Sequence, residues 1–445
     1  MIQLKKLFSV LLALIMMLAV MMPVFAVDYA VDARVKEYLV APSQYTNMGQ
    51  YGKFIESTLT ANGNTTSLGN YGGYVIYKFN TPVMNDPKNP YGVDFRISGN
   101  AFNGALTTQE PGQVWVSQDG ENWYALAGSE HYENATDWNY SVTYKNNGTN
   151  ICDYVDSNGA AGAVSGRIAA KYPDNDFYPT VEIPENELTL SGVCLAVQRE
   201  PSTKNGIQTQ FGYVDMYPNK IDNIAYNPYI ENPTLNGVDG QFDISWAVDS
   251  NGYPVRLDYV NYIKVQTATF IDGGAFGEKS TEVSRVSMIE TGEKAAFTKS
   301  AGYITVNGHE IEITEGKVGY DISEFCDGEI TVSVQADENS NVYINNLRAA
   351  ERTFEQAPDK GIIRVIVQDE EKNPQIIYLY TEEGNNAPET ETQIGDVIFE
   401  RVDTPDEEPV PEKVGFFKRV FRAIGGFFVK VYNWFKTLFN KIFNK

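Results

Sequence analysis

Between residues 32 and 290 the chain consists of short runs of β-branched and aromatic residues, separated by glycine, asparagine, aspartate and proline. Such runs are typical of β-strands, and the residues between them are typical of turns. The runs lie at 74–79, 93–97, 113–116, 123–126, 188–197, 242–248 and 259–267. No long stretch here repeats its apolar residues with the period of a helix. We therefore expect a mainly β fold, with a large antiparallel, jelly-roll-like β-sandwich over residues 32–292.

The clearest local element is a hairpin around Asp119-Gly120. An Asp-Gly pair favours the positive φ that a tight hairpin turn requires. The residues before it, Val-Trp-Val-Ser at 114–117, alternate in the manner of a strand with one buried face. The sequence therefore predicts two antiparallel strands joined near residue 120.

A second group of short strand-like runs follows, at 304–306, 329–335, 342–345, 362–367 and 375–379. Asp327-Gly328 and the Asn-rich 339–341 are turn signals between them. A segment of this length with five to seven strands fits a small immunoglobulin-like β-sandwich, which we place at 296–381.

The charge pattern distinguishes these two β regions from the end of the chain. The formal net charge is −23, which excludes a nucleic-acid binder that depends on neutralising phosphates. Residues 383–412 hold ten acidic residues and one basic residue, and they contain little to bury. We therefore expect an acidic disordered linker over 382–412.

The first 26 residues have the pattern of a secretory signal peptide. Lys5 and Lys6 precede a long apolar run that ends in Val-Phe-Ala at 24–26. The alternative is a single membrane-spanning anchor, because the run is just long enough to span. We expect cleavage after Ala26 and an extracellular mature protein. The three cysteines are too few for a disulfide framework, and a Cys152–Cys194 pair stays open.

Residues 413–445 hold eight basic residues and no acidic one, and their apolar residues recur every three to four positions. This pattern predicts an amphipathic helix that lies in an anionic membrane or envelope surface. The alternatives are that this helix docks on the acidic β regions of the same chain or on a helix of a partner protein. The expected membrane-binding residues are Phe417, Phe421, Phe428, Trp434, Phe435, Phe439, Lys418, Arg419, Arg422 and Lys436.

Several motifs in the large β region resemble a family of bacterial secreted cell-surface proteins. They lie at 69–73, 91–103, 110–112, 116–123, 240–251 and 277–286, and the resemblance spans about residues 38–288. The hairpin string Ser-x-Asp-Gly-x-x-Trp is similar to one in discoidin-like sandwiches, and 296–381 resembles the cadherin-like modules of bacterial surface proteins. The resemblance implies a β-sandwich fold and a cell-surface location more than it implies an activity.

Oxygen-bearing side chains beside these motifs are candidate calcium ligands. Calcium accepts six to eight oxygens in a flexible geometry, and loops of β-sandwiches commonly supply them. Acids that form turns or lie on the surface are the alternative interpretation. The candidate metal ligands are Asp94, Asn100, Glu110, Asp239, Asp243 and Glu282.

Trp138 and Tyr140 are the candidate glycan-binding residues, because they lie in a polar stretch and aromatic faces suit the C–H groups of sugars. Core packing is the more common role of such residues. No nucleophile elbow, phosphate-binding loop or histidine metal motif is present. We therefore expect a non-catalytic, exported surface protein that binds extracellular glycans or envelope components. A glycosidase or lyase with paired carboxylates, and a purely structural envelope component, are the alternatives.

Overall fold

The computed structural model describes residues 33–46, 54–56, 59, 65–87, 89–101, 109–146, 152–164, 187–216, 239–289, 303–314, 316–338, 340–368, 373–382 and 392–393. These residues are mainly β, in several largely antiparallel sheets, which confirms the predicted mainly β class. The predicted signal peptide, most of the acidic linker and the predicted C-terminal helix lie outside the described residues. Among the helices that are described, none has the length and apolarity needed to cross a membrane.

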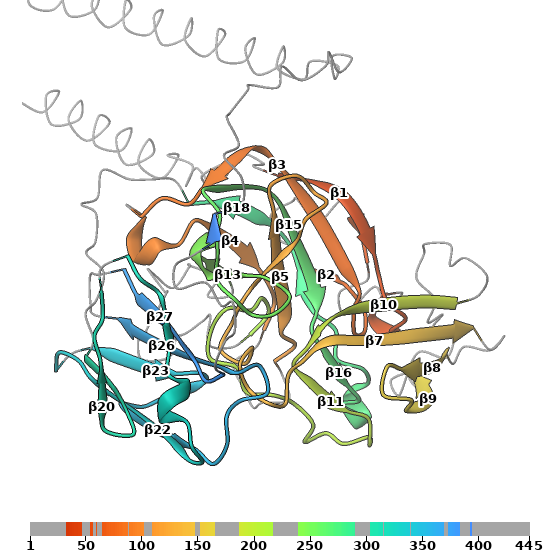
Figure 1. The fold of residues 1–445 in the computed structure, drawn as a ribbon. Helices are drawn as coiled ribbons and strands as arrows, with labels where there is room; N and C mark the ends of the chain where they lie inside the picture. Colours follow the sequence, from red (N-terminus) through yellow and green to blue (C-terminus); the bar gives the residue numbers. More distant parts are fainter. Residues whose placement is uncertain are drawn as a thin grey trace, which may run out of the picture. The chain divides into compact units, whose positions relative to one another are not determined.

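The largest sheet has six strands in the order β1-β3-β15-β5-β6-β13 (Figure 1), and its neighbours are antiparallel. Its strands are β1 (Ala33–Leu39), β3 (Tyr74–Met84), β15 (Tyr259–Thr267), β5 (Gly112–Ser117), β6 (Tyr124–Leu126) and β13 (Ala247–Val248). Alternation along β3 buries Val75, Tyr77 and Phe79 on one face. The sheet thus has one strongly apolar face.

That face packs against a three-stranded sheet in the order β12-β4-β18. Its strands are β12 (Asp239–Phe242), β4 (Phe95–Ser98) and β18 (Val286–Met288), and a short pair, β2 (Thr66–Ser67) with β17 (Glu282–Val283), accompanies it. The Phe95 ring stacks on Phe242 at 5.4 Å and contacts Phe79 of β3 at 6.4 Å. Burial of these rings holds the two layers together.

The predicted hairpin at Asp119-Gly120 is confirmed, since β5 and β6 pair antiparallel and Gly120 has a φ of +81°. Its connection is longer than the tight turn that the sequence predicts. Asp119 Oδ1 accepts hydrogen bonds from the backbone N–H groups of Glu121 and Asn122, both at 2.8 Å. The aspartate therefore organises a wider loop.

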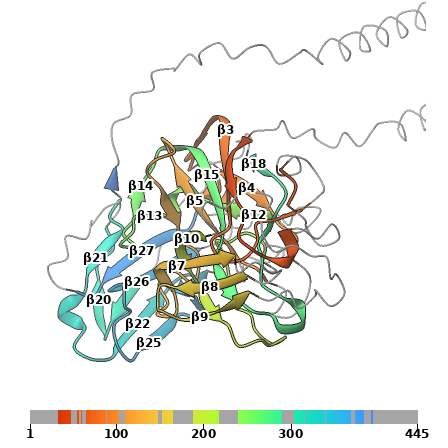
Figure 2. The same ribbon diagram turned by 90° about the vertical axis from the view of Figure 1, so that its right-hand side faces the viewer.

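A four-stranded sheet in the order β10-β7-β8-β9 lies in another part of the described chain (Figure 2). It is formed by β10 (Glu187–Cys194), β7 (Asp137–Asn146), β8 (Cys152–Asp156) and β9 (Ala161–Val164). Of these strands, only β10 was predicted from the sequence. The described chain also has two parallel pairs: β11 (Ala196–Gln198) with β16 (Thr269–Ile271), and, beside β13, β14 (Val255–Arg256) with β28 (Thr392–Gln393). Cys152, Cys194 and Cys326 are free thiols.

Residues 303–380 form two further sheets around a separate hydrophobic cluster. One has the order β20-β19-β22-β25, and the other has the order β21-β27-β26-β23-β24. The first contains β19 (Tyr303–Val306), β20 (His309–Ile311), β22 (Ile330–Gln335) and β25 (Glu351–Phe354). The second contains β21 (Gly319–Asp321), β23 (Asn341–Ile344), β24 (Leu347–Arg348), β26 (Ile362–Gln368) and β27 (Gln375–Tyr380).

Short 3₁₀ turns connect several strands: η1 (Gln44–Thr46), η3 (Pro90–Gly92), η8 (Ile244–Trp246), η9 (Gly274–Phe276) and η10 (Ser323–Phe325).

The two sheets of residues 303–380 are joined to the larger β region, residues 33–289, by polar contacts. Arg364 of β26 is 2% exposed, and its guanidinium donates to the carbonyls of Ala127 (2.6 Å) and Gly128 (2.7 Å). Arg352 pairs with Glu133 at 2.7 Å. Residues 303–380 are therefore fixed to the larger β region by buried hydrogen bonds as well as by apolar contacts.

Candidate metal centre and polar pocket

Three carboxylates from distant parts of the chain meet beside the start of β5. Glu110, Asp215 and Glu282 each offer an oxygen, and these oxygens all lie within 4.8 Å of one another. Asp215 is 1% exposed and Glu282 is 3% exposed, while Glu110 is half-buried. This set, the carboxylate cluster, can hold a metal ion.

Backbone pairing brings the cluster together. Gly112 and Val214 exchange two backbone hydrogen bonds, and the N–H of Glu110 donates to the Asp215 carbonyl at 3.2 Å. The Asp215 backbone has a φ of +60°. A side chain at Gly99 would place its Cβ 2.8 Å from Asp215 Cα, so a glycine is required for this close approach.

The Asp215 carboxylate is held in place by two backbone donors. Its Oδ1 accepts from the N–H of Asn100 and its Oδ2 from the N–H of Glu282, both at 2.9 Å. Lys279 supplies a positive charge beside the cluster, with its Nζ 3.8 Å from Glu110 Oε1. Three acidic groups thus face one nearby lysine in a buried setting.

Burial and mutual repulsion oppose ionisation of the cluster. Burial, followed by the Glu110 charge, raises the pKa of Asp215 to about 7. Burial and the charges of Glu110 and Asp215 raise the pKa of Glu282 well above its usual range. Without a cation, the cluster must therefore retain protons near neutral pH. Its all-oxygen donors suit a hard divalent ion such as Ca²⁺, Mg²⁺ or Mn²⁺.

The structure divides the six predicted metal ligands into separate places. Glu110 and Glu282 meet in the carboxylate cluster, and Asn100 joins them through its backbone N–H. Asp94 and Asp243 form a second acidic pair, and the Asp239 side chain lies outside the described residues. Asp215, the third member of the cluster, was not predicted, because nothing in its local sequence distinguishes it.

One member of the Asp94–Asp243 pair, Asp243, lines a surface pocket. Asp94, which is 1% exposed, accepts hydrogen bonds from Asp86 N (3.1 Å), Asn89 Nδ2 (2.9 Å) and Ile244 N (2.9 Å). Burial, followed by the Asp243 charge, raises the pKa of Asp94 well above its usual range, although these donors oppose the shift. Asp243 caps η8 by accepting from Ser245 N at 2.7 Å.

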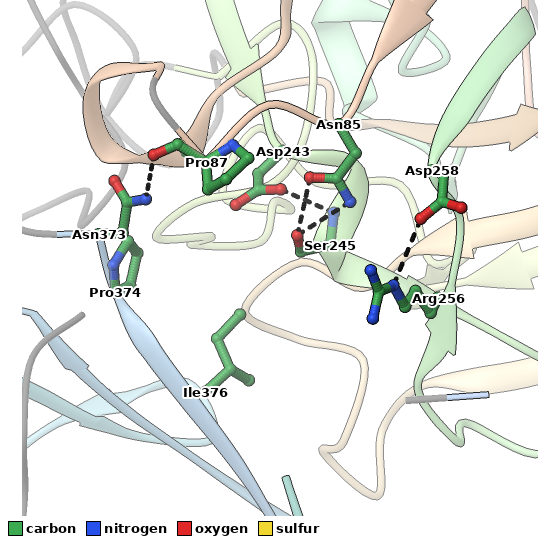
Figure 3. A pocket seen from close by; sticks show the side chains of 10 residues that line it. Asn85, Pro87, Asp243, Ser245, Arg256, Asp258, Asn373, Pro374 and Ile376 are labelled. Atoms are coloured by element: carbon green, nitrogen blue, oxygen red, sulfur yellow. Dashed lines mark hydrogen bonds and ion pairs between the residues drawn. The ribbon is translucent and has the colours of Figure 1, made fainter. Parts of the chain in front are cut away.

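The pocket beside this pair has a volume of about 250 Å³ and is shown in Figure 3. Residues between 85 and 258 form most of the pocket wall. The strand β27 and the two residues just before it complete the wall. We call it the polar pocket. Its lining residues are Asn85, Pro87, Gly92, Asp243, Ser245, Arg256, Asp258, Asn373, Pro374 and Ile376.

The predicted glycan-binding aromatics of β7 are both buried, but they pack in different hydrophobic clusters. Trp138 is 8% exposed and lines a second cavity of about 410 Å³, together with Asp137, Asn139 and Lys360. The Lys360 ammonium lies 4.6 Å from the centre of the Trp138 ring. Tyr140 is fully buried, and its hydroxyl donates to Asp156 Oδ2 at 2.6 Å.

Neither histidine has the surroundings of a general base. His131 is fully buried, and burial lowers its pKa to about 3. His309 is exposed and stacks on Phe325 at 4.6 Å.

A comparison of the chain with protein-family models gives no match, and a comparison with curated proteins gives none either.

Proposed function

We propose that this chain is an exported, non-catalytic surface protein that binds extracellular glycans or envelope components. In this proposal a Ca²⁺ ion at Glu110, Asp215 and Glu282 ties together the loops of a jelly-roll-like large sandwich. The strands of 303–380 form the immunoglobulin-like second sandwich, and the predicted C-terminal helix retains the protein at an anionic surface.

The burial of the carboxylate cluster is the observation that carries the non-catalytic assignment. A glycosidase needs two carboxyl groups that reach the glycosidic bond and, in most families, a water molecule. Asp215 and Glu282 are only 1% and 3% exposed, so a polymeric substrate has no access to them. Buried acids close enough to share an ion suit a structural cation instead.

Among hard cations, calcium fits this site best. Mg²⁺ demands near-ideal octahedral geometry and usually keeps several waters, whereas Ca²⁺ accepts irregular protein oxygens. The backbone hydrogen bonds at Asp215 hold its oxygens in an arrangement set by the fold rather than by a metal. A flexible coordination shell is therefore the better match.

The support for surface retention comes from the sequence. Each basic residue near an anionic surface contributes about 1 kcal/mol, and residues 413–445 contain eight of them without an acidic residue. The two polar cavities support the binding role, because they provide concave sites lined with hydrogen-bonding groups.

A glycan-array screen of the full chain, with Ca²⁺ and with a chelator, tests the proposal. We expect binding to a defined set of glycans that weakens when calcium is removed. Silence across a broad array refutes glycan binding and favours a structural envelope component. Release of new reducing ends from a bound glycan refutes the non-catalytic assignment.

A further inference from the structure

We propose that the polar pocket of Figure 3 binds a single sugar residue through its hydroxyl groups. This inference rests on the proposed glycan-binding function and assigns it a site. The site is distinct from the predicted Trp138 and Tyr140, neither of which lines this pocket.

The residues that line the pocket differ in burial. Gly92, Asp243, Asn373 and Pro374 are buried, and we call them the floor. The walls contain half-buried Asn85, Ser245 and Ile376, and the rim contains exposed Pro87, Arg256 and Asp258. A ligand that enters would therefore exchange water for fixed polar groups at its inner end.

The floor contains an acceptor that has no hydrogen-bond donor among the described residues. Asn373 is 6% exposed, and its Nδ2 donates to the Pro87 carbonyl at 2.8 Å. Its Oδ1 is buried and accepts no hydrogen bond in the part of the chain that the structure describes. This oxygen is closed to solvent, so Asn373 contributes to the pocket as a fixed wall that the Pro87 carbonyl holds in place.

The walls add groups of both hydrogen-bonding kinds. Asn85 Nδ2 donates to the Leu257 carbonyl (3.0 Å) and to Ser245 Oγ (3.1 Å), and this fixes the amide and the hydroxyl beside the pocket. At the rim, Arg256 Nε lies 3.3 Å from Asp258 Oδ1. Figure 3 shows these groups around one opening.

This mixture favours a neutral polyhydroxylated ligand over a charged one. Asp243 and Asp258 oppose an anion, and Arg256 opposes a cation. A hydroxyl group both donates and accepts, so several hydroxyls can satisfy amide, carboxylate and guanidinium groups together. Pro87, Pro374 and Ile376 supply apolar surface for the C–H face of a sugar ring.

The volume sets the size of the ligand. At about 250 Å³ the pocket is smaller than the ~300–1,000 Å³ of sites that enclose drug-sized molecules. It therefore suits one sugar residue, presented at the end or along the edge of a glycan.

The test uses methyl glycosides of glucose, galactose, mannose and N-acetylglucosamine as probes, with the full chain and ligand-observed NMR titration. The double variant Arg256→Ala/Asp258→Ala removes the exposed rim charges, and Asp243→Asn alters the floor. Lys145→Ala/Glu187→Ala is the matched control, because it removes an exposed acid–lysine pair between β7 and β10 that lines neither cavity. Thermal unfolding of each variant verifies that it folds.

We expect at least one glycoside to bind, and its affinity to fall about tenfold or more in the rim variant while the control stays unchanged. Unchanged affinity in both pocket variants overturns the assignment, and so does loss of affinity only in the control. If the glycan array is positive and no glycoside binds, this inference fails and the proposed function stands. A silent array together with no bound glycoside removes this inference and the glycan-binding part of the proposed function.

Discussion

The Asp215→Asn substitution tests the carboxylate cluster directly, because it removes one charge and one oxygen ligand at almost constant volume. In the cation-free protein, the pKa of Asp215 is raised from 3.8 to about 7. The folded state therefore holds this proton more tightly than the unfolded chain does. The resulting stabilisation is fully present below pH 3.8 and is lost as the pH rises through about 7. At about 1.4 kcal/mol per pH unit, the loss is about 4 kcal/mol.

A bound cation reverses this loss by neutralising the repulsion. At a concentration 100 times its dissociation constant, Ca²⁺ adds about 2.7 kcal/mol to the free energy of unfolding. For a chain of 445 residues the gain corresponds to about 3 °C in melting temperature. The gain should be larger at pH 8 than at pH 5, since protons compete with the metal for the same oxygens.

Asparagine keeps one acceptor but replaces the other with a donor. One of the two backbone N–H groups, of Asn100 or of Glu282, then loses its partner, at a cost of about 1–3 kcal/mol. At pH 8 the substitution also removes the repulsion between Asp215 and the other ionised carboxylates, which offsets this cost. At pH 4 Asp215 is protonated, so there is little repulsion to remove. With chelator present, the variant should therefore be less stable than the parent at pH 4 and equally or more stable at pH 8.

The measurement is thermal unfolding of the full chain by circular dichroism at pH 4, 6 and 8, with CaCl₂ or with a chelator. Asp119→Asn is the control, because Asp119 lies in the β5–β6 hairpin and outside the cluster. We expect calcium to raise the melting temperature of the parent and of the control, but not of the Asp215 variant. A full calcium shift in the Asp215 variant would refute the metal site.

Three further predictions concern other parts of the chain. Desolvation raises the pKa of Asp119, but hydrogen bonds from Asn122, Glu121 and Ser117 outweigh it and lower the pKa to about 2. Asp119→Ala should therefore reduce the melting temperature at pH 7, and the deficit should disappear as the pH falls through about 2. Arg364→Met removes the donor of the buried Ala127 carbonyl and leaves the Gly128 carbonyl with only the 3.4 Å bond from His131 N. It should lower the free energy of unfolding by about 2–4 kcal/mol in denaturant titrations, whereas Arg256→Met should change it by less than about 0.5 kcal/mol. A chain that ends at Thr381 should no longer co-sediment with anionic liposomes, and equal sedimentation of the full and shortened chains would rule out the membrane anchor.

The strands could be predicted wherever the chain alternates with a plain apolar pattern. The run at 74–79 is such a case, and it forms the first part of β3. The strand β7 was missed although its signal is present: Trp138, Tyr140, Val142 and Tyr144 alternate and are all buried. Interleaved polar residues made this stretch look like surface, whereas a two-residue period is the stronger signal.

The candidate sites show the limit of sequence reasoning more clearly. Glu110 and Glu282, two of the predicted metal ligands, do lie together, but they were grouped with Asp94 and Asp243, which the fold places in a different acidic pair. Asp215 reaches the cluster through a hydrogen bond from Asn100, 115 residues away in sequence. The polar pocket likewise combines Asn85, Asp243 and Asn373, and no local pattern relates residues so far apart.

The sequence by itself determined the β character, the position of the Asp119 hairpin and the residue types available for oxygen ligands, because strand alternation and turn chemistry act over a few neighbouring residues. The tertiary structure decided which acids meet, how deeply they are buried and which polar side chains share a pocket. These properties depend on pairings between distant strands, and the energies of buried charges change with every such pairing.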